Sequence, residues 1–259
     1  MQIGASTACL YPMLIEEALD TLLQQGFRLV EVFLNTPSEA SPAFARSLKA
    51  QATAADARIV ATHAYLSVAE PFCLFSHYER RFQDYLLEYR RMFEGAAEMG
   101  AKFLVLHGDR AVDPTLSPAD FAKRYEALYD AGQEYGVTLL QENVVRFRAQ
   151  SPAFVRKMRE LLGEKAQFVL DLKQCRRAGV SAAEMMEAMG EGLRHLHISD
   201  GGAAGDCLLP GKGNEDFAAL FSQLQHQGYT GDGVIELYRR DFGDPAELWQ
   251  GRAALLPHI

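Results

Sequence analysis

One unit recurs along the chain: an amphipathic helical segment, a glycine, a short apolar run and then a polar residue. In "GVTLLQEN", Gly136 precedes the apolar run, and Glu142 follows it. Glycine suits the left-handed residue that closes a helix, so each such glycine is expected to end a helix and lead into a strand. Six predicted strands follow such a glycine, and eight are predicted in all, near residues 2–5, 27–34, 58–64, 102–107, 137–142, 167–171, 193–198 and 233–237.

The predicted helices between these strands are marked at their starts. A serine or aspartate that can cap a helix opens the segments "SPAD", "SPAF", "SAAE" and "DPAE", at residues 117–120, 151–154, 181–184 and 244–247. Apolar strands that alternate with helices belong in a parallel sheet covered on both faces. Eight such units predict a closed (β/α)₈ TIM barrel, formed as a single domain by residues 1–259. The alternative, an open doubly wound sheet, lacks the usual G-x-G-x-x-G after the first strand.

Composition narrows the classes of partner. The chain has 26 basic and 34 acidic residues and a formal net charge of −8, which disfavours nonspecific nucleic-acid binding. The cysteines form no C-x-x-C pair, so reduced thiols in a cytoplasmic protein are expected; they are Cys9, Cys73, Cys175 and Cys207. We find no signal peptide and no apolar run near the ~20 residues that cross a bilayer, so no membrane partner is expected.

Polar residues stand where the predicted strands end. From the second strand to the eighth they are Glu31, His63, His107, Glu142, Asp171, His197 and Glu236. Active sites of such barrels lie at the C-terminal ends of the strands, and the last four residues follow neighbouring strands, so they can converge. Three carboxylates and one imidazole are a mostly oxygen ligand set, which suits one octahedral Mn²⁺, Mg²⁺ or Co²⁺ ion. Taken singly, Glu31, His63 and His107 fit a structural role equally well.

Three further features have two interpretations each. Asp200 in "HISDGG" is either a weaker candidate for the site or a turn aspartate, because the segment is typical of a turn. The backbone amides of "LPGKG" (209–213) can hold an anion, although the segment also reads as an ordinary loop. Four arginines after strand ends either face a phosphate or are surface charges: Arg110, Arg146, Arg148 and Arg239.

With these residues assembled, the chain resembles the xylose-isomerase-like TIM-barrel superfamily, and most of all its sugar isomerase/epimerase branch, which includes hydroxypyruvate isomerase and the ketose 3-epimerases. The resemblance rests on Glu142, Asp171, His197 and Glu236, and on a P-G-x-G loop at 210–213. It implies that these four residues bind one divalent metal, with Mn²⁺ as first choice and Mg²⁺, Co²⁺ or Zn²⁺ as alternatives. The family usually has D-x-x-H on the sixth strand, whereas this chain has Gln174 in place of the histidine.

The resemblance implies a metal-dependent isomerase or epimerase of a sugar, a sugar phosphate or a keto acid. A carbonyl and a neighbouring hydroxyl of the substrate would bind the metal, which makes the C–H between them acidic and stabilises an enediolate. Glu142 and Glu236 are the expected catalytic residues, one removing the proton and the other returning it. The residues expected to bind substrate are His63, His107, Gln174, Lys212 and Arg239.

Other activities stay open at this point. The same superfamily contains an apurinic endonuclease with three zinc ions, but this chain lacks the histidine at 174 and any histidine in the loop 199–213. A metal phosphodiesterase of that type and a noncatalytic metabolite-binding barrel are the two alternatives. Dehydratase chemistry and a homo-oligomeric state also stay open.

Overall fold

The computed structural model describes residues 1–65 and 68–259. Its centre is a closed barrel of parallel strands in the order β1-β10-β7-β6-β5-β4-β3-β2. The barrel strands are β1 (Ile3–Ser6), β2 (Leu29–Phe33), β3 (Arg58–His63), β4 (Phe103–Leu106), β5 (Thr138–Glu142), β6 (Phe168–Asp171), β7 (Leu193–Ile198) and β10 (Asp232–Ile235). The predicted (β/α)₈ barrel is therefore confirmed.

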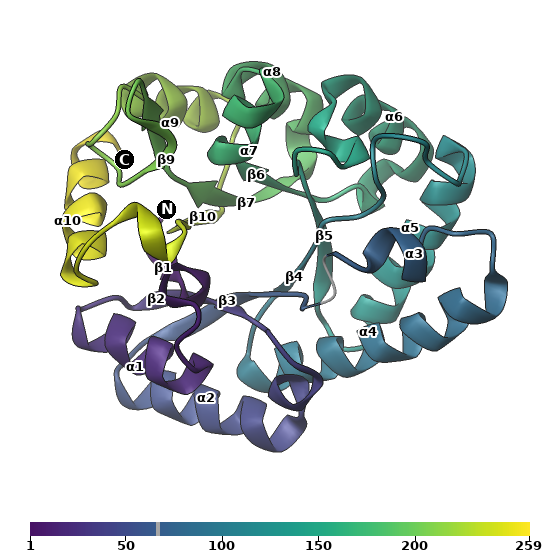
Figure 1. Cartoon of the computed structure of the whole chain (residues 1–259), viewed down its shortest axis with the longest axis horizontal. Helices are drawn as coiled ribbons and strands as arrows, with labels where there is room; N and C mark the ends of the chain where they lie inside the picture. Colours follow the sequence, from purple (N-terminus) through teal and green to yellow (C-terminus); the bar gives the residue numbers. More distant parts are fainter. Residues whose placement is uncertain (66–67) are drawn as a thin grey trace.

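Helices form an outer ring that follows the chain around the barrel (Figure 1). The longer ones are α1 (Ile15–Gln24), α2 (Pro42–Ala54), α4 (Glu79–Met99), α5 (Pro118–Gln133), α6 (Pro152–Leu162), α8 (Ala182–Met189), α9 (Phe217–His226) and α10 (Ala246–Leu255), and the short ones are α3 (Glu70–Cys73) and α7 (Leu172–Ala178). Ser117 and Ser181 cap α5 and α8 by accepting backbone N–H groups, as predicted. Ser151 stands at the start of α6 without such a bond. Within the described ranges, no helix combines the length and apolarity needed to span a membrane.

The core has two parts. A large apolar cluster lies between the strands and the helices, with Tyr89, Tyr125 and Phe93 among its fully buried side chains. Two smaller clusters consist of strand residues alone, and Phe103 of β4 packs against both. Because these two are separate from the strand–helix core, we assign them to the barrel interior, where side chains of a TIM barrel pack in layers.

Two sequence expectations need correction. The segment after the seventh barrel strand is not only a loop: β8 (Asp200–Gly202) and β9 (Gly205–Leu208) form an antiparallel hairpin there. Glu31 does not end the second strand, because β2 continues to Phe33. Since side chains of a strand alternate, Glu31 and Phe33 face the same side of β2, and Glu31 lies one layer deeper.

Candidate active site

Four of the predicted site residues lie together at the C-terminal ends of adjacent strands. Glu142 ends β5, Asp171 ends β6, His197 lies in β7 and Glu236 directly follows β10. Each offers one potential ligand atom, and these atoms all lie within 4.8 Å of one another. All four side chains are buried, Glu236 being the most exposed at 8%. We call this set the carboxylate cluster.

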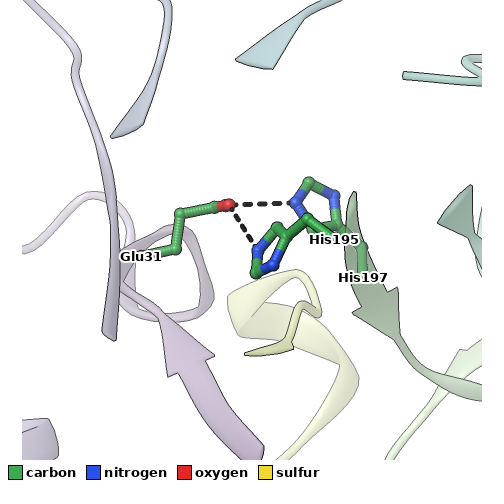
Figure 2. A group of neighbouring side chains, drawn as sticks. All are labelled: Glu31, His195 and His197. Atoms are coloured by element: carbon green, nitrogen blue, oxygen red, sulfur yellow. Dashed lines mark hydrogen bonds and ion pairs between the residues drawn. The ribbon is translucent and has the colours of Figure 1, made fainter. Parts of the chain in front are cut away.

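His197 is oriented by a carboxylate on its far side. Its Nδ1 lies 3.1 Å from Oε1 of Glu142 and 3.1 Å from Oε2 of Glu236. Its Nε2 lies 3.1 Å from Oε2 of Glu31, which also contacts Nε2 of His195 at 3.2 Å (Figure 2). Glu31 is therefore placed to accept the Nε2–H of His197, which leaves Nδ1 facing the carboxylate cluster. Metal-binding histidines usually have such an outer hydrogen-bond partner.

The charges of this region shift the pKa values of its acids in opposite directions. Burial alone would raise the pKa of Glu31, but the charges and hydrogen bonds of His197 and His195 lower it to about 2. For Asp171 burial dominates, and the charges of Glu142 and Glu236 add to it, so that its pKa rises to about 7 although Lys173 opposes the change. Asp171 is therefore the acid of the cluster that takes up a proton most readily.

A second group of potential ligands adjoins the first. Oε2 of Glu142 lies 3.3 Å from Nε2 of His63 and 3.1 Å from Nε2 of His107, and the two imidazole nitrogens are 3.1 Å apart. Glu142 therefore faces His197 with one oxygen and this histidine pair with the other. Burial would raise the pKa of Glu142, but its hydrogen bonds with the three histidines hold that pKa well below its usual range. A role of His63 and His107 in substrate binding stays a prediction.

Lys173 belongs to the site, although the sequence reasoning did not single it out. Its Nζ lies 2.9 Å from Oδ2 of Asp171 and 3.1 Å from Oε2 of Glu236, and only 3% of the residue is exposed. The signal in the sequence was a lysine two residues after a strand-end aspartate. In the family pattern D-x-x-H this lysine occupies an unspecified position, directly before Gln174.

The residues of the carboxylate cluster fit a divalent cation. Three carboxylates converge on one imidazole nitrogen, an arrangement of like charges that is costly in a buried place unless a cation compensates it. Oδ2 of Asp171 is buried and makes no hydrogen bond among the described residues, although the ammonium of Lys173 lies 2.9 Å away. Oxygen donors with one imidazole suit Mn²⁺, Mg²⁺ or Co²⁺.

The other predicted substrate residues lie in different surroundings. The side-chain Oε1 of Gln174 accepts a hydrogen bond from the backbone N–H of Val145 at 3.1 Å. Lys212 is exposed in the loop after β9. Arg239 donates to the backbone oxygen of Phe242 at 2.9 Å. The substrate contacts of Gln174, Lys212 and Arg239 stay predictions.

The glycine-rich loop holds an anion that belongs to the chain itself. The backbone N–H groups of Gly211 and Gly213 donate to Oδ2 of Asp200, both at 2.9 Å. Those of Gly201 and Glu215 donate to Oδ1 of Asp200 at 2.8 and 3.0 Å. These amides are therefore engaged by an internal carboxylate, which gives Asp200 a structural role in the loop.

Two of the arginines considered for phosphate binding have partners in the protein. Arg110 donates to the backbone oxygen of Asp113 at 3.0 Å, and Arg148 donates to that of Leu116 at 2.9 Å.

A cavity of about 330 Å³ opens beside Lys173 and Glu236. Aromatic side chains line much of it, namely Tyr11, Phe33, Tyr65 and Tyr238.

Comparison with known proteins agrees with this architecture. A family model described as xylose isomerase-like TIM barrel matches residues 19–257. A D-tagatose 3-epimerase-like protein superposes with a TM-score of 0.80 at 19% identity, covering 100% of this chain and 97% of that chain. The 3-keto-D-glucoside 4-epimerase of E. coli superposes with a TM-score of 0.77 at 22% identity, covering both chains fully, at 100% each. An uncharacterised protein of Mycobacterium tuberculosis is 27% identical over 267 residues, covering 92% of this chain and 89% of the relative.

Proposed function

Because the chain belongs to the xylose isomerase-like TIM barrel family, we propose that it is a divalent-metal-dependent isomerase or epimerase of a sugar, a sugar phosphate or a keto acid. The observation that carries the proposal is the convergence of Glu142, Asp171, His197 and Glu236 within one buried site. Superposition on epimerase structures supports it at the level of the fold. We place the protein in the cytoplasm, in keeping with its four free cysteines.

In this proposal the four residues of the carboxylate cluster hold the metal ion, with Mn²⁺ preferred. A bound dication would supply the Lewis acidity that makes a C–H next to a carbonyl acidic. Glu31 keeps the Nδ1 of His197 turned toward the cluster through its contact at Nε2. The aromatic walls of the adjacent cavity exclude water from the reacting carbon and pack against the substrate.

Glu142 and Glu236 move the proton. They come from β5 and from the end of β10, and each places one oxygen 3.1 Å from Nδ1 of His197. Burial would raise the pKa of Glu236, but His197 and Lys173 hold it well below its usual range. Both glutamates are therefore carboxylates that can accept a proton. One removes it from the substrate carbon, and the other returns it to the opposite face or to the neighbouring carbon.

The group of His63, His107 and Glu142 supports a second candidate, a metal phosphodiesterase. Two-metal hydrolases place neighbouring ions so that they stabilise both the attacking and the leaving oxygen, and Glu142 is shared between two ligand groups here. The net charge of −8 and the engaged arginines Arg110 and Arg148 weigh against a nucleic-acid substrate.

One experiment separates these candidates. The Mn²⁺-loaded protein is incubated in D₂O with ketoses, ketose phosphates and hydroxypyruvate, and NMR follows the hydrogen at each carbon. Proton transfer through an enediolate should place deuterium at the reacting carbon of at least one compound. A parallel assay with bis(p-nitrophenyl) phosphate tests for phosphodiesterase activity. Hydrolysis of that compound with no deuterium uptake across the panel would reject the isomerase and favour the second candidate.

A further inference from the structure

A buried lysine lies inside the carboxylate cluster. Nζ of Lys173 contacts Asp171 at 2.9 Å and Glu236 at 3.1 Å, and it lies 5.2 Å from the centre of the Tyr238 ring. Lysine is almost never fully buried unless it is paired. Asp171 ends β6 and Glu236 directly follows β10, so the ammonium joins two potential metal ligands that are far apart in the sequence.

The helix on which Lys173 lies does not explain why its ammonium is buried. Asp171 is the N-cap of α7, and Lys173 lies in the first turn of that helix. The first turn of a helix favours anions and disfavours cations because of the helix dipole. The carboxylates of the cluster, rather than the helix, therefore account for the buried ammonium at this position.

Lys173 changes the charge balance of the site. The three carboxylates of the cluster would exceed the charge of one dication by a full negative charge. With the ammonium included, the set carries two net negative charges, which a single divalent ion neutralises. The same ammonium repels an incoming dication, because like charges a few ångströms apart interact strongly in a buried site.

We propose that Lys173 is a built-in counter-cation of the metal site. It holds Asp171 and Glu236 together while the metal is absent, and it weakens metal binding so that the ion stays exchangeable. This inference rests on the proposed function only in requiring that the cluster bind a dication. Lys173 is thus a positioning residue that acts through the metal ligands.

The test measures Mn²⁺ binding, with MnCl₂ alone as the probe. Wild type, Lys173→Met and Lys173→Arg are stripped with a chelator and titrated by calorimetry at about pH 8. A matched control is Lys165→Met, because Lys165 also pairs with two carboxylates, Glu126 and Asp130, both at 2.8 Å, but is partly exposed. Thermal unfolding in the presence of chelator is the second readout.

Lys173→Met should bind Mn²⁺ about tenfold more tightly than wild type or better, because the repelling charge is gone. Its metal-free form should unfold at a lower temperature, since the carboxylates lose their counter-cation. Lys173→Arg and Lys165→Met should keep the wild-type affinity within about threefold. A gain in affinity is an effect that structural damage does not produce.

The outcomes distinguish this inference from the proposed function. If wild type binds Mn²⁺ and Lys173→Met binds it equally or more weakly, the counter-cation role is rejected while the metal-dependent function stands. If neither protein binds Mn²⁺, the metal-dependent function fails as well. Should Lys173→Met fold only with Mn²⁺ present, competition with a coloured chelator gives its affinity, and the same criterion applies.

Discussion

Single side chains decide the chemistry of this site, and Glu142 is the clearest case. One of its oxygens faces His197 and the other faces His63 and His107. Glu236 contacts both His197 and Lys173 through one oxygen. In the proposed function each glutamate both binds the metal and moves a proton, and substitution can separate these two roles.

Glu142→Gln and Glu236→Gln keep the shape of the side chain and an oxygen ligand but remove the base. Each should lower the turnover number by ~10²–10⁴, the usual contribution of a general acid or base. Asp171→Asn removes a ligand without a proposed proton-transfer role, so excess Mn²⁺ should restore part of its activity. Turnover is measured on whichever compound takes up deuterium, at saturating Mn²⁺. Near-normal rates for both glutamine variants would falsify the two-base assignment.

At the scale of elements, the loop between the β8–β9 hairpin and α9 is organised by one carboxylate. Asp200 accepts four backbone N–H groups, from Gly201, Gly211, Gly213 and Glu215. Gly211 also has a φ of +85°, in the left-handed region that favours glycine. The loop therefore depends on both its glycine conformation and its internal anion.

Asp200→Ala should destabilise the protein by about 1–3 kcal/mol, because a buried hydrogen-bond acceptor is lost and its donors are left without a protein partner. Chemical denaturation measures this change, and limited proteolysis should show earlier cleavage within residues 199–215. A suitable control is Asp216→Ala, which removes one capping bond to Ala219 nearby. That control should cost about 1 kcal/mol and leave the loop resistant to protease. Equal protease resistance of Asp200→Ala and wild type would contradict this role.

At the scale of the whole molecule, the proposed metal site would connect half of the barrel. Its ligands come from β5, β6, β7 and the end of β10, which lie side by side in the barrel. An ion bound to all of them is bound by the folded chain only. Metal binding should therefore stabilise the whole fold and not the site alone.

Mn²⁺ at about 100 times its dissociation constant should stabilise the protein by ~2.7 kcal/mol, seen as a higher unfolding temperature. This gain should shrink as the pH falls through about 7, because the pKa of Asp171 is raised to about 7 by burial and a proton then competes with the metal. His197 adds to the effect, since nearby carboxylates outweigh burial and raise its pKa.

In the metal-free protein, Asp171 should make the stability of the fold change with pH in the opposite direction. Between the ordinary pKa of an aspartate, about 3.9, and about 7, the folded chain keeps a proton that the unfolded chain has lost, so this group makes the fold less stable as the pH rises. Thermal unfolding across this range, with Mn²⁺ or with chelator, and with Asp171→Asn as the reference, measures both effects. A metal-induced gain that is constant from pH 5 to 8 would contradict the prediction.

The amino-acid sequence by itself was enough to predict the barrel and the four residues of the carboxylate cluster. Every strand is marked locally by an apolar run, and most β/α units also have a glycine or a helix-capping residue. Parallel strands that alternate with helices must all end on one face, so the residues that follow the strands meet. This is why Glu142, Asp171, His197 and Glu236 could be grouped from their positions alone.

The contacts that these strand-end residues make with other parts of the chain could be determined only from the tertiary structure. Glu31 meets His197 across 166 positions of sequence because the barrel closes through β1, which pairs with both β2 and β10. The contacts of Lys173 depend on how α7 starts directly after β6. Those of Asp200 depend on the β8–β9 hairpin. Such contacts depend on strand register and side-chain direction, which arise only when the whole chain packs and which no local pattern of residues encodes.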